Sequence, residues 1–228
     1  MIVWLLLALH VGVVLVLAVG AGKITSRHVV FGLTAIPAGC SAVFAAIRLG
    51  ADSPLTTSVT WVEQLDLRIA FRVDELSALL ALIVSGVGVL VFVYAMGYFG
   101  PSASGVAKFG ATLLAFSTAM VGLVLADSVW TLFVFWELTS ITSFLLVGHK
   151  HADPATRAAA RRALLITAAG GLVLLAGLLV VTSATIDGGS GDTGLRALGP
   201  VGGTAGAVGA VLILVAAATK SAQVPFHV

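Results

Sequence analysis

The sequence has little charge and almost no cysteine, and each shortage excludes a class of protein. Only 10% of its 228 residues are charged, against about 25% in an average soluble domain. A soluble core of this length could not bury the 59% of residues that are hydrophobic. The single cysteine, Cys40, leaves no disulfide framework and no thiolate metal site. We expect Cys40 to pack between helices.

The charged residues are too few and too scattered to recognise a nucleic acid. Twelve basic and ten acidic residues give a net charge of +2, and they are spread over several segments without forming a basic patch. No Cys/His cluster, nucleotide-binding loop or nucleophile motif is present. The sequence therefore predicts no metal, no cofactor and no soluble catalytic centre.

Long apolar runs fill most of the chain, whose mean hydropathy is +1.13. The first run lacks the basic segment of a signal peptide, and its roughly 20 residues reach about 30 Å as a helix, enough to span a bilayer. Helices are expected because an open strand would leave backbone groups unpaired in lipid. We predict an all-α integral membrane fold with about seven transmembrane helices in a single domain, residues 1–228. The predicted spans are residues 2–21, 28–49, 74–99, 107–126, 128–148, 162–185 and 204–223.

The long segment between the second and third spans, residues 50–73, has a different pattern. Apolar Leu67, Ile69 and Phe71 alternate there with other residues. A period of two is typical of a strand. We therefore predict a short extracellular hairpin in this segment.

Charge placement predicts the orientation in the membrane. Segments after the first, third and fifth spans carry mostly basic residues, and those after the second, fourth and sixth carry mostly acids. The former hold seven basic residues against one acid, Asp153: Lys23, Arg27, Lys108, Lys150, Arg157, Arg161 and Arg162. The latter hold four basic residues, Arg48, Arg68, Arg72 and Arg196, and eight acids: Asp52, Glu63, Asp66, Asp74, Glu75, Asp127, Asp187 and Asp192. By the positive-inside rule the first set faces the cytoplasm, which places the N-terminus outside.

Glu137 is the acidic residue that lies deepest in a predicted span. It follows Asp127 by ten residues, which places it about 15 Å inside the span, near the midplane. An acid at a helix centre costs about 2.5–3.5 kcal/mol on insertion scales. We interpret Glu137 as a proton relay group, with a protonated glutamate in one interhelical hydrogen bond as the simpler alternative. The hydroxyls of residues 139, 140, 142 and 143 either hold water for a relay or bond back to carbonyls one turn earlier.

Lys220 allows two interpretations on sequence alone. The apolar residues that precede it already suffice to reach the cytoplasmic edge, where a lysine can snorkel. Alternatively, if residues 199–206 belong to a loop, Lys220 lies deeper, and Pro225 interrupts the helix beside it as in transporter ion sites. A buried lysine can exchange a proton.

Other features receive structural interpretations. His10 lies midway along the first span, where one interhelical hydrogen bond is the expected role. Gly202, Gly206 and Gly209 give the last span a small-residue face for helix packing. The chain stops after His227 and Val228 without a polar tail, so we expect it to be the N-terminal part of a longer protein. The roles of His10 and His227 are left open.

Several motifs resemble those of one family of membrane proteins. Residues 73–77, 82–88 and 94–99 read VDELS, LIVSGVG and YAMGYF, and they resemble the third helix of the largest antiporter-like membrane subunits. Residues 135–140, FWELTS, and 219–227, TKSAQVPFH, are similar to that family's fifth helix and its broken seventh helix. The similarity runs from about residue 60 to the end. The family includes the large A-type subunit of Mrp-type multisubunit Na+/H+ antiporters and the related proton-pumping chain 5, or L, of respiratory complex I.

The resemblance implies an inverted-repeat fold of which this chain holds the first part. It also implies that Glu137 and Lys220 form a charge pair whose association and separation gate proton movement. Partners would be the other subunits of an antiporter in a bacterial cell membrane, exchanging protons for Na+ or K+. The sequences of residues 136–140 and of 164–171, LLITAAGG, resemble those of the antiporter branch more than those of complex I. The alternatives are a subunit of a redox-driven proton pump, as in complex I or a membrane hydrogenase, and a structural scaffold.

Overall fold

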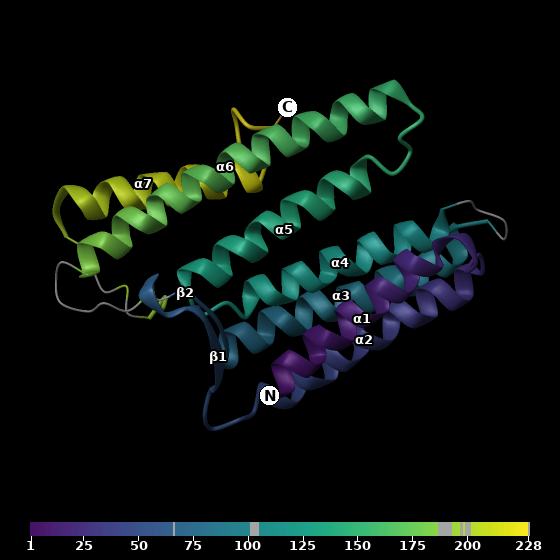
Figure 1. The fold of residues 1–228 in the computed structure, drawn as a ribbon, viewed down its shortest axis with the longest axis horizontal. Helices are drawn as coiled ribbons and strands as arrows, with labels where there is room; N and C mark the ends of the chain where they lie inside the picture. The colour runs from purple at the N-terminus through teal and green to yellow at the C-terminus, as the bar shows by residue number, and fades with distance from the viewer. Residues whose placement is uncertain (66, 101–104, 187–192, 197, 199–201, 228) are drawn as a thin grey trace. The chain divides into compact units, whose positions relative to one another are not determined.

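A computed structural model describes residues 1–65, 67–100, 105–186, 193–196, 198 and 202–227. Within this part, seven helices are long and apolar enough to cross a membrane; Figure 1 draws their arrangement along the chain. They are α1 (Ile2–Val19), α2 (Arg27–Arg48), α3 (Glu75–Tyr98), α4 (Val106–Val124), α5 (Val129–Val147), α6 (Pro154–Ile186) and α7 (Gly203–Lys220). The prediction of an all-α, multi-pass membrane fold is confirmed.

The largest difference in bounds concerns α6, which begins at Pro154, eight residues before the predicted start at 162. Proline fits the first turn of a helix because its missing N–H has no partner there anyway. Asp153 accepts a hydrogen bond from the amide of Ala155 at 3.0 Å, and so caps the helix. Hydropathy locates only the apolar part of a helix, whereas α6 continues through a charged turn.

The described contacts fall into two compact units. One comprises Met1–Thr57 and Phe71–Leu125, and the other comprises Ser58–Ala70 and Ala126–Val228. The prediction of one transmembrane domain stays a prediction.

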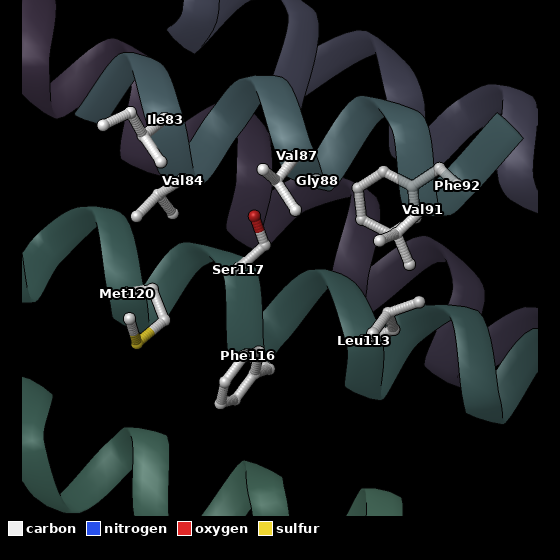
Figure 2. Close-up of a pocket in the computed structure, with 10 residues that line it drawn as sticks. All are labelled: Ile83, Val84, Val87, Gly88, Val91, Phe92, Leu113, Phe116, Ser117 and Met120. Carbon is white, nitrogen blue, oxygen red and sulfur yellow. The ribbon is translucent and has the colours of Figure 1, made fainter. Parts of the chain in front are cut away.

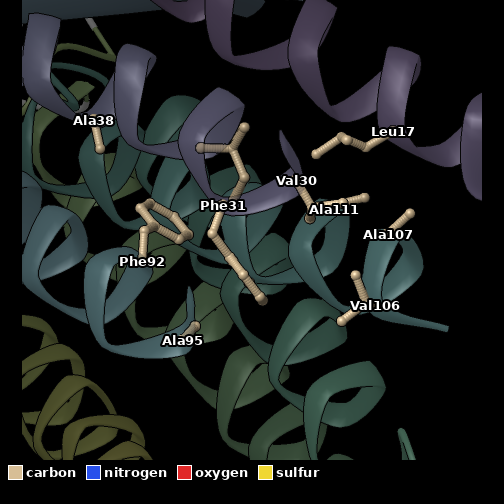
Figure 3. Close-up of a cluster of buried hydrophobic side chains, with 10 residues drawn as sticks. Leu17, Val30, Phe31, Ala38, Phe92, Ala95, Val106, Ala107 and Ala111 are labelled. Atoms are coloured by element: carbon tan, nitrogen blue, oxygen red, sulfur yellow. The ribbon is translucent and has the colours of Figure 1, made fainter. Parts of the chain in front are cut away.

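The first unit contains the four helices α1 to α4, and its core lies where all four meet. Leu17, Phe31, Phe92 and Leu114 are each at most 1% exposed and come from four different helices; Figure 3 shows most of this cluster. Phe31 and Phe92 are its two buried aromatic rings, and each buries a large apolar area. Cys40 does not join the core: it is exposed on α2, so the expectation that it packs between helices was wrong.

The second unit contains α5, α6 and α7, with α6 in contact with both other helices. Two glycines set the crossing of α6 and α7. A Cβ at Gly177 would lie 2.9 Å from Leu212 Cβ, and one at Gly209 would lie 3.3 Å from the carbonyl oxygen of Gly177. Such small residues allow two transmembrane backbones to approach closely. The packing role predicted for Gly209 is confirmed, whereas Gly202 lies before the first residue of α7 and a Cβ there would meet nothing within 4 Å.

The segment between α2 and α3 forms a two-stranded sheet of β1 (Leu55–Val62) and β2 (Leu67–Val73). The alternating residues of the sequence coincide with β2, in which Phe71 and Val73 are each 1% exposed. The short connection between the strands requires an antiparallel pair. The extracellular location of this hairpin stays a prediction. Of the acids used to predict the orientation, Asp66, Asp187 and Asp192 lie outside the described residues, as do residues 199–201.

Candidate functional site

Glu137 lies in the middle of α5, the ninth of its nineteen residues. About 12 Å of helix therefore separate it from the first residue of α5. Its Oε1 atom is buried and, within the described part of the chain, has no hydrogen-bond partner. A buried carboxyl without a donor is costly. Such an atom is a common sign of a functional group or an ordered water.

Lys220 is the last residue of α7, and its side chain turns toward α5. Its Nζ donates hydrogen bonds to Thr139 Oγ1 at 2.7 Å and to Ser140 Oγ at 2.8 Å. A longer contact of 3.4 Å reaches the carbonyl oxygen of Trp136. The ammonium also lies 5.1 Å from the centroid of the Trp136 ring, within the range of a cation–π interaction. Lys220 is half-buried, and its described hydrogen bonds all go to α5; its depth in the membrane stays a prediction.

The hydroxyls that accept from Lys220 also bond back along their own helix. Thr139 Oγ1 donates to the carbonyl of Trp136 at 2.7 Å, and Ser140 Oγ donates to the same carbonyl at 3.3 Å. A hydroxyl can do both because it has one donor and two acceptor lone pairs. The two uses that the sequence left open for these hydroxyls therefore occur together. Thr142 bonds back to α5 carbonyls, at 2.7 Å to Leu138 and 3.3 Å to Thr139.

Hydrogen bonds to residues of β2 hold the first residues of α5 in place. Ser128 caps the helix by accepting from the amide of Thr131 at 3.1 Å, and it donates to the carbonyl of Arg68 at 2.8 Å. Thr131 Oγ1 accepts from the amide of Ala70 at 2.8 Å. The amide of Val129 donates to the carbonyl of Thr193 at 3.1 Å. These bonds fix the position of α5 along its axis. They therefore also fix the position of Glu137 along that axis.

Glu137 and the acceptors of Lys220 therefore lie within one turn of α5, in the same unit. Sequence reasoning singled out Glu137, Lys220 and the hydroxyls, but it missed Gly171 of α6. A Cβ on Gly171 would overlap Glu137 Oε1. The only sequence signal for this contact is the adjacent pair Gly170 and Gly171, which is unusual inside a helix because glycine costs about 1 kcal/mol there.

His10 lies in the other unit. Its Nδ1 lies 2.8 Å from the carbonyl of Leu6, one turn back on its own helix. Its Nε2 is buried without a partner in the described part of the chain. The interhelical hydrogen bond expected for His10 is therefore not made; the ring bonds along α1 instead. His227 follows the last helix, and the described contacts of the site do not include it.

Two further features bear on the choice of site. A groove of about 290 Å³ runs between α3 and α4, lined by apolar side chains and by Ser117, whose hydroxyl points toward α3 in Figure 2. The residues described along this groove include no titratable group, so they offer no acid or base for a relay. Among the described residues, no three His, Cys, Asp or Glu side chains lie close enough together to hold a metal ion.

A half-buried carboxyl and an ammonium bound to hydroxyls, among apolar helices, define a class of protein. They are features of multi-pass membrane proteins, in which ionisable groups inside the bundle mark ion pathways. Comparison with known proteins identifies the family within that class. Residues 126–228 match a family model described as NADH:quinone oxidoreductase/Mrp antiporter, transmembrane. Residues 59–109 match the N-terminus of chain 5 of NADH-ubiquinone oxidoreductase, complex I.

The chain belongs to this family of antiporter-like membrane subunits. A relative from Rhizobium meliloti, named as a probable K(+)/H(+) antiporter subunit of the A/B type, is 42% identical over 175 residues, which are 74% of this chain and 17% of the relative. The "Putative antiporter subunit mnhA2" of Staphylococcus aureus is 29% identical over all of this chain and 29% of its own length. The solved Mrp complex from Dietzia sp. DQ12-45-1b has a chain that is 33% identical with a TM-score of 0.83, covering 100% of this chain and 24% of that one. The chain thus spans less than a third of the length of each.

Proposed function

We propose that this chain is part of the large A-type subunit of a multisubunit monovalent cation/proton antiporter, and that Glu137 and Lys220 form its proton relay. One observation carries the proposal. The Lys220 ammonium is bound by the hydroxyls of Thr139 and Ser140, two and three residues after Glu137 on the same helix. A carboxyl and a cation thus share one turn of α5 at the depth where ionisable groups are most costly.

The relay works through the interaction between the two charges. A carboxylate near the ammonium stabilises its positive charge, and this stabilisation is lost when the carboxylate moves away or takes up a proton. Lys220 can then release one proton to the next group of the path and take up another from the preceding side when the carboxylate returns. The hydroxyls hold the nitrogen in place during both steps. Movement of Glu137 therefore controls whether Lys220 holds or releases its proton.

The same proposal includes the membrane, the orientation and the partners of the chain. The chain lies in a bacterial cell membrane with its N-terminus outside, which places Lys23, Lys108 and Lys150 on the cytoplasmic side. Its partners are the other subunits of the antiporter, and the exchanged ions are protons and Na+ or K+. The names of the Rhizobium and Staphylococcus relatives, both antiporter subunits, support the antiporter branch.

The direct test uses the complete complex that contains this chain, in inverted membrane vesicles. Glu137→Gln and Lys220→Ala should each reduce cation-dependent proton exchange by at least about tenfold, because each removes one member of the relay. Glu75→Gln is the matched control, since Glu75 is an exposed glutamate at the start of α3. Wild-type exchange in the Glu137→Gln complex, with normal assembly, would reject the relay.

A second candidate is the proton-translocating subunit of an NADH:quinone oxidoreductase or membrane hydrogenase. The family models that match the chain also describe NADH:quinone oxidoreductase. Neighbouring genes separate the candidates: small antiporter subunits favour the first, and quinone or iron–sulfur subunits favour the second. A purely structural scaffold predicts that replacing Glu137 and Lys220 together by apolar residues leaves transport unchanged.

A further inference from the structure

The carboxyl of Glu137 occupies space that any residue other than glycine would fill at position 171. A Cβ built on Gly171 would overlap Glu137 Oε1, lie 2.8 Å from the carboxyl carbon and 3.5 Å from Oε2. Gly170, the residue before it, faces α7: a Cβ there would lie 2.8 Å from the Cβ of Thr219. Two successive glycines of α6 thus make room for Glu137 of α5 and for the residue before Lys220 of α7.

The Lys220 ammonium is bound by acceptors of α5, and the Glu137 carboxyl lies against α6 without a hydrogen bond to Oε1 in the described part of the chain. The three N–H groups of a lysine ammonium have three acceptors here, namely Thr139, Ser140 and the Trp136 carbonyl. Glu137 Oε1, by contrast, is buried without a hydrogen-bond partner in the described part of the chain. The structure therefore holds the acid against the backbone of α6 and the base against the hydroxyls of α5.

We propose that Gly171 is a positioning residue for the relay, forming a notch that holds the Glu137 carboxyl apart from the Lys220 ammonium in one of its two states. This inference rests on the proposed function of the pair. In the notch the carboxyl receives no hydrogen bond from the described residues, whereas contact with Lys220 would supply a charge-assisted one. The notch is therefore a shallow resting place that the carboxyl can leave. A side chain at position 171 would fill the notch, and the state in which the carboxyl lies apart from the ammonium would be lost.

Alanine at position 171 tests the notch without disrupting the bundle. The added methyl group meets the far end of a flexible side chain, which can swing aside, rather than backbone atoms. The carboxyl, not the helix, is therefore expected to move. Gly39→Ala on α2 is the matched control, because a Cβ there meets nothing within 4 Å and the chemical change is the same.

The experiment uses the complete complex in inverted vesicles, with exchange measured across a range of pH. Gly171→Ala should reduce the exchange rate by about tenfold or more and displace its pH profile, because the carboxyl titrates in new surroundings. Gly39→Ala should match the wild type in both. The double variant Gly171→Ala with Glu137→Asp should exchange faster than either single variant, since aspartate is one methylene shorter and leaves room for the methyl group.

Each outcome bears on the notch separately from the relay. A wild-type rate and pH profile in Gly171→Ala, with Glu137→Gln inactive, would overturn the notch and leave the relay standing. A reduced rate with an unchanged pH profile and no recovery in the double variant would indicate general packing damage, which also overturns the notch. Wild-type exchange in Glu137→Gln would remove the proposed function itself.

Discussion

The ammonium of Lys220 lies 2.7 Å from Thr139 Oγ1, although 81 residues separate the two in the chain. This bond joins the end of α7 to the middle of α5. It directs a lysine at a helix end toward a neighbouring helix of the second unit. Because Ser140 accepts from the same nitrogen at 2.8 Å, the position of Lys220 depends on two adjacent hydroxyls.

The first prediction concerns those hydroxyls. Thr139→Val keeps the shape of the side chain but removes an acceptor of a charged donor, a bond worth about 1.5–3 kcal/mol when fully buried. We expect a loss of free energy near the lower end of this range, because Lys220 is only half-buried. The exchange rate of the complete complex should fall by about tenfold, since 1.4 kcal/mol corresponds to that factor.

Thr142→Val provides the control for this prediction. Its hydroxyl donates to carbonyls of its own helix and is not among the acceptors of Lys220 described above, so its loss leaves those contacts intact. Both variants are compared by exchange rate and by thermal unfolding of the purified complex in detergent. Equal effects of the two substitutions on exchange would contradict a special role for Thr139.

Much of this arrangement was readable from the sequence, and the rest was not, for identifiable reasons. The position of Glu137 midway along its helix followed from the length of the apolar run, which requires only the neighbouring sequence. The direction of the Lys220 side chain did not, because a lysine at a helix end can reach water or a neighbouring helix equally well. Gly171 was missed because its role depends on which residue of α5 faces it. The early start of α6 was missed because hydropathy does not detect helix in a charged turn.

The second prediction concerns the pH dependence of stability at the start of α3. Asp74 caps α3 by accepting from the amide of Ser77 at 3.0 Å, and it also pairs with Arg72 at 3.0 Å. The hydrogen bond from the Ser77 amide is the main reason that the pKa of Asp74 is lowered from its ordinary value of 3.8. A carboxyl whose pKa is lower in the folded state stabilises the fold above its unfolded pKa, and this contribution is lost as the pH falls through the folded value.

Thermal unfolding of the purified protein in detergent, measured from pH 6 down to about pH 3, should therefore reveal the contribution of Asp74. Asp74→Ala should lower stability at pH 6 by about 1 kcal/mol, the usual value of an N-cap. We expect no more, because the carboxylate is 40% exposed and its pairing with Arg72 is weakened by solvent. Wild type and variant should converge as the pH falls below 3.8. A constant difference across this range would contradict the titration of Asp74 as its cause.

The third prediction concerns the crossing of α6 and α7. A Cβ at Gly209 would lie 3.3 Å from the backbone carbonyl of Gly177 and 3.7 Å from Val180 Cγ1. Because backbone atoms cannot swing aside, Gly209→Ala should force the two helices apart and cost about 1–3 kcal/mol by overpacking. The midpoint of thermal unfolding in detergent measures this loss. Gly12→Ala is the control, since a Cβ there meets nothing within 4 Å; a similar loss in both would argue against the crossing as the cause.

The last prediction compares two serines that are equally buried, with 0% exposure each, and differ in their hydrogen bonds. Ser128 Oγ caps α5 and also donates to the carbonyl of Arg68 at 2.8 Å. Ser85 Oγ, on α3, has no partner within the described part of the chain. Removing a hydroxyl with partners costs its hydrogen bonds, whereas removing one without partners relieves an unmet desolvation cost. We therefore expect Ser128→Ala to lower stability by about 1–2 kcal/mol.

Ser85→Ala should instead leave stability within about 0.5 kcal/mol of the wild type or raise it. Thermal unfolding of both variants in the same detergent gives the difference directly, and the shared substitution cancels the loss of side-chain volume. Ser128→Ala should in addition reduce the exchange rate, because the hydrogen bonds of Ser128 fix the position of α5, and therefore of Glu137, along the helix axis. A larger loss of stability in Ser85→Ala than in Ser128→Ala would mean that an ordered water or another partner satisfies Ser85 within the membrane.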